Sequence, residues 1–578
     1  MNVDVLVAEI GSTTTVVNAF TDLDTDHPCF WGQGQAPTSV LDGDVRVGLQ
    51  GAVDDLCKNK GISSIEYGQM LATSSAAGGL KMTVHGLVYD MTAKAAKEAA
   101  LGAGGIIHYV TSGRLRRTDL KKIREIQPNL ILIAGGVDYG ERDTALDNAE
   151  MIRSMGLKVP VIYAGNVENQ EEIKLIFEDS EQELYIVENV YPKIDALNVE
   201  PCRKVIQQAF EQHITHAPGM EHVRDMVSGP IIPTPGAVME CTKVLYDCIG
   251  DLIVLDVGGA TTDLHSVAVE SDKVARIMTS PEPKAKRTVE GDLGVFVNRY
   301  KVIESIGEEK LREECENELH IDLDKTLETY YAIPKNEDEI KLVERLTREA
   351  VFRATERHAG QLRYIYGPSG RSTVAEGKDL TQVKYIVGTG GALTRLPHRV
   401  EIMEEIPGEN ITGMRLFPTD HAKVLVDNDY IMASLGVLSK TNREAAIKLL
   451  EKSLDFEFPE KVEDEIYKSS IKAMEDVEAE YEAKKKKEEE YAEHIREMEE
   501  MGYDMSAYKE EEPIGGANAR GPEGSHHDPA KEGIEAGGGL QPGWNREKQE
   551  DTSKPWNNCN RECDICTHTH CPNNQSRR

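Results

Sequence analysis

The chain has 578 residues, 39% of them hydrophobic, so it is long enough for several domains and apolar enough to form sizeable cores. Its net charge of −34 argues against nucleic acid or an anionic membrane as the main partner, because both require clustered cationic surface. No apolar run approaches the roughly 18 residues of a membrane span, the acidic N-terminus does not resemble a signal peptide, and six of the ten cysteines are scattered singly, so we expect a cytoplasmic protein.

The first predicted element is a hairpin near the N-terminus, within residues 1–95, which we expect to begin a first lobe. An apolar strand from Leu6 ends in Glu9 and is followed by Gly11-Ser12-Thr13-Thr14, a turn of small and hydroxyl-bearing residues. Such a turn presents backbone N–H groups and hydroxyls to an anion, and an acid at the end of the strand can hold a metal ion nearby.

An inserted α/β subdomain is predicted over residues 96–230, where strand and helix patterns alternate. Leu130–Ile133 has the composition of a buried parallel strand and residues 159–164 that of another, with a helix between them over residues 143–155. Because this subdomain is not needed to bind a nucleotide, it is the candidate partner-binding region.

A second copy of the hairpin lies in residues 231–455, which we expect to form the second lobe and the interlobe linker. Its strand ends in Asp256, and Gly258-Gly259-Ala260-Thr261 follows, so the acid, the glycine, the small residues and two threonines recur in the register of the first copy. Two such turns facing each other would contact the phosphates of a nucleotide from both sides. The recurrence therefore predicts a duplicated, two-lobed ATP-binding protein.

A third turn, Gly388-Thr389-Gly390-Gly391, follows a strand predicted to begin at Tyr385. It is not a dinucleotide fingerprint, because Leu393 stands where the last glycine of G-x-G-x-x-G would fall. Glycines let a flat base approach the backbone, so we assign Gly388, Gly390 and Gly391 to adenosine. A plain strand-to-helix turn is the alternative.

The predicted site has a metal part and a phosphate part. Glu9 and Asp256 are assigned as catalytic residues that hold magnesium, through water molecules. Phosphate would be bound by residues of the two hairpins, namely Gly11, Ser12, Thr13, Thr14, Gly258, Gly259, Thr261 and Asp263. Two ordinary hairpins are the alternative, since glycine-rich turns between Val and Ile strands are common.

Asp263-Leu264-His265 begins a near match to the D-x-H-x-x-G motif of cobalamin-binding proteins. Ala268 replaces the glycine of that motif, and the segment already lies inside the second hairpin. We therefore expect that His265 is not a cobalamin ligand.

The C-terminal part differs sharply in composition. Residues 456–512 are dense in Glu and Lys and are predicted to form a solvated helix, whereas residues 513–555, rich in Gly and Pro, are predicted to be disordered. The tail, residues 556–578, contains Cys559, Cys563, Cys566, His568, His570 and Cys571. Zinc, an iron–sulfur cluster and free cysteines without a metal are the three interpretations of this spacing, and the ligand types favour zinc.

The two hairpins and the third turn, in this order, resemble the actin, hexokinase and Hsp70 superfamily of ATPases. The resemblance implies an α/β, two-lobed actin-like (ribonuclease H-like) core, with interlobe segments at residues 233–238 and 433–436. Many members carry an acid just before the first of these segments, which orients the attacking water. Here Ile232 occupies that place, so we expect slow hydrolysis, with Glu240 as the candidate base.

Further segments narrow the resemblance to the glutamate mutase L (GlmL/MutL) family, over residues 1 to about 450. These segments are residues 74–82, 132–138, 163–166, 197–201, 256–266, 287–294 and 390–397. The resemblance implies an ATP- and magnesium-dependent reactivating factor, or chaperone, for an adenosylcobalamin-dependent mutase or aminomutase. Glu9 departs from the Asp that is usual at its position in the family.

Two other functions share the predicted core. One is a small-molecule kinase or a hydantoinase/oxoprolinase-like ATP-dependent enzyme. The other is an iron–sulfur ATPase that activates a dehydratase by electron transfer, through a cluster in the tail. A kinase would turn over ATP with a small substrate, and an iron–sulfur protein would be brown.

Overall fold

The computed structural model describes residues 1–11, 14–40, 43–75, 80–215, 219–220, 222–367 and 370–459. The predicted linker and the Cys/His tail, together with nearly all of the predicted charged helix, lie outside the described residues.

Two five-stranded sheets have the same topology. The first contains β1 (Asn2–Ile10), β2 (Thr14–Thr21), β3 (Cys29–Pro37), β4 (Glu66–Ser74) and β10 (Ile231–Pro233), in the order β10-β4-β1-β2-β3. The second contains β11 (Leu252–Val257), β12 (Thr262–Val267), β13 (Ala285–Glu290), β16 (Tyr385–Thr389) and β17 (Lys423–Val426), in the order β13-β12-β11-β16-β17.

In each sheet, three strands form an antiparallel meander and two more strands add in parallel beside the first strand of the meander. Thus β1 pairs antiparallel with β2 and parallel with β4, just as β11 pairs antiparallel with β12 and parallel with β16. This duplicated arrangement is the actin-like (ribonuclease H-like) α/β fold, and the predicted fold class is confirmed.

The central strands are apolar on both faces because helices cover both faces. In the first sheet, α1 (Val45–Lys60) covers one face. The second sheet is covered on its outer face by helices that include α10 (Arg299–Ile306), α13 (Glu337–His358) and α14 (Gly390–Arg395). Such strands appear in a sequence as continuous hydrophobic runs rather than as alternating patterns.

Three helices pack between the inner faces of the two sheets: α8 (Thr234–Ile249), α16 (Met432–Leu438) and α17 (Arg443–Leu454). Val5 and Val7 of β1 and Leu252 and Val254 of β11 belong to the same core as these helices. The duplicated hairpins therefore lie on strands that share one hydrophobic core, which connects the lobes.

Helices α8 and α16 approach each other very closely. A Cβ atom added to Gly436 of α16 would overlap the carbonyl oxygen of Ala237 in α8. Only glycine fits at this crossing, because any side chain would push the two helices apart. The predicted interlobe segments are the start of α8 and the middle of α16.

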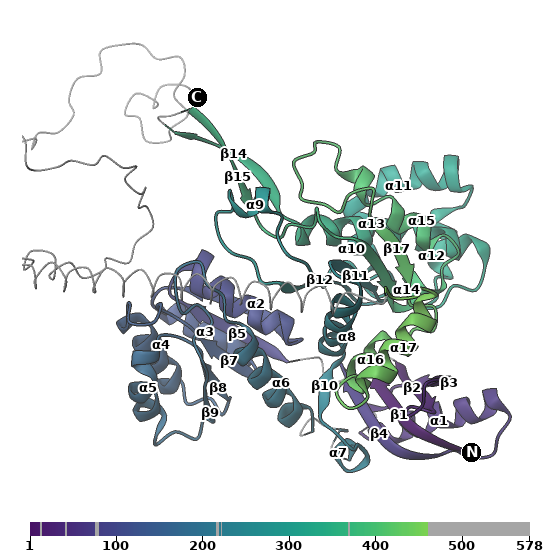
Figure 1. Ribbon diagram of the computed structural model, residues 1–578, viewed down its shortest axis with the longest axis horizontal. Coiled ribbons are helices and arrows are strands. Elements are labelled where there is room, and N and C mark those ends of the chain that lie inside the picture. Colours follow the sequence, from purple (N-terminus) through teal and green to yellow (C-terminus); the bar gives the residue numbers. More distant parts are fainter. Residues whose placement is uncertain are drawn as a thin grey trace, which may run out of the picture. The chain divides into compact units, whose positions relative to one another are not determined.

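The third sheet forms the inserted subdomain. Its strands are β5 (Lys81–Gly86), β6 (Ile106–Ser112), β7 (Leu130–Ile133), β8 (Val161–Tyr163) and β9 (Leu184–Ile186), all parallel, in the order β6-β5-β7-β8-β9. Figure 1 shows this sheet with helices around it.

Helices cover both faces of the inserted sheet. One face packs against α2 (Lys94–Gly102) and α6 (Glu200–Thr215). The other packs against α3 (Arg117–Ile126), α4 (Asp143–Ser154) and α5 (Gln170–Phe177). The subdomain is thus doubly wound.

The inserted subdomain begins earlier than predicted, and the strand that follows its predicted end belongs to the first sheet. Strand β5 begins at Lys81, so the expected boundary at residue 95 falls inside α2. At the other end, β10 pairs with β4 of the first sheet, although it lies in the range predicted for the second lobe. The pairing of β10 joins residues 231–233 to residues 72–74, and a local sequence pattern does not reveal a relation between such distant segments.

The remaining described elements belong mainly to the second lobe. They are α7 (Val223–Met226), α9 (Asp272–Ala275), α11 (Glu308–Glu314), α12 (Leu323–Glu328), α15 (Arg399–Glu404) and the two-stranded hairpin of β14 (Gln361–Gly367) and β15 (Gly370–Glu376). Among the described helices, none is long and apolar enough to cross a membrane. The six cysteines of the described residues are free thiols.

His85 on β5 should make the stability of the inserted subdomain depend on pH. Its ring is fully buried between the hydroxyls of Thr83 (3.0 Å) and Thr111 (2.8 Å), and burial lowers its pKa from 6.5 to about 4. The unfolded chain therefore binds one more proton than the folded chain between these pH values, and the free energy of unfolding falls as pH drops through them. At pH 4 the loss from this one residue is about 3 kcal/mol.

Urea unfolding at a series of pH values checks this effect. The His85→Gln variant should show a shallower dependence of the unfolding midpoint on pH between 6.5 and 4 than the natural chain. Equal slopes would contradict a neutral, buried His85.

Candidate functional site

The two hairpins have equivalent turns. The N–H of Gly11 donates to the carbonyl of Thr14 at 3.0 Å in the first, and the N–H of Gly258 donates to the carbonyl of Thr261 at 2.9 Å in the second. The sequence repeat is therefore also a repeat in backbone geometry. Ser12 and Thr13, predicted to bind phosphate, lie outside the described residues.

Strand β1 delivers Glu9 to a buried position at the end of the first sheet. The Glu9 carboxylate accepts hydrogen bonds from Ser434 Oγ at 2.6 Å and Asn18 Nδ2 at 3.2 Å. Because Ser434 lies on α16 and Asn18 on β2, the carboxylate connects the first lobe to an interlobe helix.

Asp427 is a third carboxylate at the same centre, and the sequence analysis missed it. It directly follows β17 and accepts hydrogen bonds from Thr389 Oγ1 at 2.9 Å, Ser453 Oγ at 2.7 Å and the N–H groups of Ile431 and Met432 at 3.1 and 3.0 Å. The signal that could have found it is a strand ending in an acid, as at Glu9 and Asp256, here without a glycine-rich turn after it.

Burial and the electrostatic repulsion among these three carboxylates raise the pKa values of Glu9 and Asp256. Burial raises the pKa of Glu9 to about 7, and the charge of Asp427 adds to that effect. Burial also raises the pKa of Asp256 to about 7, with Asp263 and Glu9 pushing it up and Arg287 pulling it down. Burial raises the pKa of Asp427 against the hydrogen bonds that it accepts. A site of this kind favours a proton or a cation over a free carboxylate.

Glu9 should therefore make the nucleotide-free protein less stable as pH rises. Its folded pKa, about 7, lies above the unfolded value of 4.5, so the folded chain binds more protons between these values, and stability falls as pH rises through them. We expect Glu9→Gln to raise stability at pH 8 by up to about 3 kcal/mol.

Thermal unfolding in a chelator at pH 5 and pH 8 measures the effect of Glu9. The Gln variant should lose much less stability between the two pH values than the natural chain. An identical loss in both proteins would show that Glu9 is ionised throughout.

The third turn lies directly against the Asp256 hairpin. Gly390 has a φ of 81°, and a Cβ added to it would overlap a carboxylate oxygen of Asp256 and the backbone of Val257. Gly388 faces Met403 and Leu393, whereas Gly391 is exposed with open space beside it. The predicted adenosine turn and the predicted metal-holding acid are therefore adjacent.

The second hairpin turn is exposed at its tip and covered from behind. The carbonyl of Gly258 accepts from Val295, and that of Gly259 accepts from Phe296 and Val297. Within the described part of the chain, the N–H groups of Gly259 and Ala260 have no hydrogen-bond partner. With its carbonyls bound on one side, this turn has N–H groups available for an anion.

The first turn is covered in a similar way. The hydroxyl of Thr38 donates to the carbonyl of Gly11 at 2.9 Å and bonds to the hydroxyl of Thr15 at 2.9 Å. Thr14 is exposed beside it. The carbonyl of Gly11 is thus occupied by a hydrogen bond, as are the carbonyls of Gly258 and Gly259 in the second turn.

Asp263, predicted to bind the cofactor, is instead bound by an arginine. Arg287 on β13 donates to the same Asp263 carboxylate oxygen through Nε at 2.9 Å and Nη2 at 2.6 Å, and both side chains are buried. The other oxygen accepts from Thr261 Oγ1 at 3.2 Å, so Asp263 orients the turn from behind.

Arg287 also reaches the inserted subdomain. Its Nη1 donates to the carbonyl of Leu101, near the C-terminal end of α2, at 3.0 Å. One side chain therefore connects the second hairpin to the inserted subdomain. The sequence could not reveal this contact, because the two partners are 186 residues apart.

Arg287→Met should destabilise the protein by about 3–5 kcal/mol, because it leaves the carboxylate of Asp263 buried without its partner. The double variant Asp263→Leu with Arg287→Met removes both charges and should recover most of that loss. Denaturant unfolding of the three proteins measures the difference. Equal destabilisation by the single and double variants would contradict an important role for the ion pair.

Glu240, predicted as the hydrolytic base, lies in a different environment. Its two oxygens pair with Lys243 of α8 at 3.2 Å and with Lys440, which follows α16. Burial alone would raise its pKa, but the two lysines outweigh burial and hold the pKa below 4.5. This is a salt bridge that joins the interlobe helices, not the environment of a general base, and the prediction is corrected accordingly.

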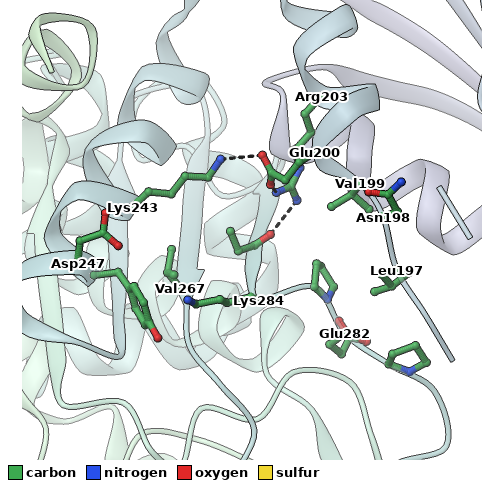
Figure 2. A pocket seen from close by; sticks show the side chains of 14 residues that line it. Leu197, Asn198, Val199, Glu200, Arg203, Lys243, Asp247, Val267, Glu282 and Lys284 are labelled. Atoms are coloured by element: carbon green, nitrogen blue, oxygen red, sulfur yellow. Dashed lines mark hydrogen bonds and ion pairs between the residues drawn. The ribbon is translucent and has the colours of Figure 1, made fainter. Parts of the chain in front are cut away.

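Lys243, which pairs with Glu240, lines the pocket shown in Figure 2. The pocket has a volume of about 640 Å³ and lies between the start of α6, α8 and residues 281–285. Lys243 bonds to Glu200 at 3.1 Å, and Arg203 donates to the carbonyl of Ala285 at 2.7 Å. Its lining includes none of the predicted nucleotide-binding residues.

Ile232 and His265 are both buried within strands. Ile232 is buried in β10 opposite Thr73. His265 is completely buried in β12, so its ring has no access to a bulky cofactor such as cobalamin. In the described residues, no three Cys, His, Asp or Glu side chains are grouped as direct metal ligands. The predicted zinc or iron–sulfur ligands of the tail lie outside those residues.

The comparisons with known proteins begin with a family model described as MutL protein, which matches residues 5–454. The chain is 35% identical over 460 residues to Protein MutL of Clostridium tetanomorphum, which covers 78% of this chain and 98% of that protein.

Solved structures with a similar chain path include two nucleotide-free proteins. Diol dehydratase-reactivating factor is 10% identical, with 76% of this chain and 99% of that chain covered and a TM-score of 0.30. Acetone carboxylase is 11% identical, with 76% and 70% covered and a TM-score of 0.35. Likenesses this weak carry no functional argument. The family match, however, spans all the lobes described above, and the chain belongs to the MutL protein family.

Proposed function

We propose that the chain is an ATP-dependent reactivating factor for an adenosylcobalamin-dependent mutase or aminomutase, of the glutamate mutase type, and that it promotes the exchange of damaged cobalamin. The observation that carries the proposal is the meeting of two equivalent strand ends, Glu9 of the first lobe and Asp256 of the second, in a member of the MutL family.

The residues of the site fit a magnesium nucleotide. The exposed N–H groups of Gly259 and Ala260 would donate to phosphate, and the carboxylates of Glu9 and Asp256 would hold magnesium through water molecules. The raised pKa values of both acids support a cation, because a nearby positive charge relieves the repulsion between them. The open space beside Gly391 would accommodate the adenosine.

Binding at this site would bias the relative position of the two lobes. Ser434 on α16 donates a hydrogen bond to Glu9, and Gly436, two residues later, lies against α8. A rearrangement at the carboxylates would therefore act on the helix pair between the lobes. A two-lobed protein has open and closed states, and a ligand that prefers one state shifts the population toward it.

Slow turnover suits this function. Ile232 cannot accept a proton, and Glu240 is held by two lysines, so neither of these two positions provides a general base. A factor that acts by holding one state needs a long-lived nucleotide complex more than fast hydrolysis. The mutase would bind the state that ATP favours and release its damaged cobalamin in that complex.

A reactivation assay tests the proposal. A glutamate mutase-type enzyme is inactivated with aged cofactor and then given the protein, ATP, magnesium and fresh adenosylcobalamin. We expect activity to return with ATP and not without it, and Asp256→Ala to lower the rate at least tenfold, because it removes one of the two carboxylates of the metal site. Asp420→Ala, an exposed acid distant in sequence from the hairpins, is the matched control.

Two results would count against the proposal. Recovery at the same rate without ATP would exclude ATP-dependent reactivation. ATP turnover that increases with a sugar or small acid, and is indifferent to the mutase, would favour the kinase alternative.

A further inference from the structure

The carboxyl-terminal edge of the inserted sheet has the topology of a binding edge. Its strand order, β6-β5-β7-β8-β9, is the doubly wound order 2-1-3-4-5. After β5 the chain crosses to β6 on one side, and after β6 it returns to β7 on the other, so the loops after β5 and β7 diverge. In such sheets, ligands and partners bind outside the carboxyl ends of the strands, at this point of divergence.

Exposed apolar side chains gather in the loops at this edge. The loops after β5, β7, β8 and β9 contain Val88, Tyr89, Tyr139, Val167 and Ile194, all exposed. The loops also contact one another: the N–H of Asp138 donates to the carbonyl of Pro192, and that of Val167 to Asp138 Oδ1. We call these five side chains and their loops the docking edge. A soluble protein rarely exposes so many large apolar groups together without a partner.

Tyr139 is the most exposed of the five side chains, at 79%, and its backbone is strained. Its φ is 62°, in the left-handed region that glycine tolerates and a bulky aromatic residue does not. Such a conformation is energetically unfavourable and persists only where surrounding contacts enforce it. Strain that presents an aromatic ring to solvent indicates a function at that position.

Asparagines from the neighbouring loops enforce this conformation. Asn166, after β8, accepts from the N–H of Tyr139 at 3.1 Å and donates to the carbonyl of Gly140 at 3.3 Å. Asn189, after β9, donates to the carbonyl of Gly136 at 3.0 Å and to Asp138 Oδ1 at 2.9 Å. Both asparagines are buried. The loop is therefore a rigid support for one exposed tyrosine, which lowers the entropy lost on binding.

The charges around the docking edge define the partner. In the loops that define it, exposed acids outnumber exposed bases: Asp90, Glu141, Asp143, Glu168, Glu188 and Asp195 against Arg142 and Lys193. A second copy of this chain, with a net charge of −34, would be repelled. The complementary surface is an apolar pocket with a rim of basic side chains.

We propose that the docking edge is the surface that binds the mutase, with Tyr139 as the anchor that enters an apolar, basic-rimmed pocket on that enzyme. This inference rests on the proposed function and names the residues that would carry it. Tyrosine is enriched among the residues that contribute most of the binding energy of protein interfaces, and here it is held rigidly.

The Tyr139→Gly variant tests the inference. Glycine adopts the same backbone conformation without strain, so the thermal stability of the variant should equal or exceed that of the natural chain. Its Kd for the mutase, measured by isothermal titration with purified glutamate mutase-type enzyme and ATP, should rise at least tenfold. The matched control is Tyr366→Ala on β14, because Tyr366 is 78% exposed and lies in the other half of the chain.

The outcomes separate this inference from the proposed function. If the natural chain binds and reactivates the mutase and Tyr139→Gly does so equally well, the docking edge is overturned while the function stands. If the natural chain does neither, both are overturned. If Tyr139→Gly instead abolishes self-association of the natural chain in sedimentation experiments, the edge is an interface between copies, and the mutase assignment is overturned.

Discussion

The arrangement of the lobes depends on the cost of bringing three carboxylates together. Glu9, Asp256 and Asp427 are mutually repulsive and largely shielded from water, and each would be costly to bury without partners. Three of the donors that offset this cost come from the start of α16: the Ser434 hydroxyl for Glu9 and two backbone N–H groups for Asp427. Because α16 crosses α8 at Gly436, the same helix stabilises the carboxylates and packs against the other interlobe helix.

Helix α2 connects the inserted subdomain to the second hairpin. Its C-terminal end receives Arg287, which also holds the acid behind the second hairpin turn. Its N-terminal end follows directly from the loop after β5, where Tyr89 belongs to the docking edge. A single helix of nine residues thus joins the two surfaces, and a helix moves as a rigid body more readily than it deforms. If the proposed partner and nucleotide sites are coupled, this helix provides a direct path between them.

Local patterns in the sequence predicted local structure well. The strand Leu130–Ile133 and the helix over α4 were correct to within a residue, because hydrophobic runs and turn residues are decided within a few positions. The two hairpins and the third turn were also located correctly. The failures concerned relations between distant segments: the start of the inserted sheet at β5, the pairing of Asp263 with Arg287, and the lysines that bond to Glu240. The spacing of Glu240 along its helix does not reveal which residues of other elements its side chain contacts. Asp427 was missed because it follows a strand but is not followed by a glycine-rich turn.

The short strand β10 has an evolutionary consequence. It lies beside β4 in the first sheet, with Pro233 opposite Ser74, so the chain leaves that sheet for the inserted subdomain and returns to it at neighbouring points. Recombination could therefore exchange everything between these strands without opening the sheet. A replacement would need to keep the contacts of the insertion with the second lobe, among them the carbonyl that Arg287 binds and the bond from Arg203 to Ala285. One two-lobed frame could in this way acquire different insertions, through a graft at a single seam.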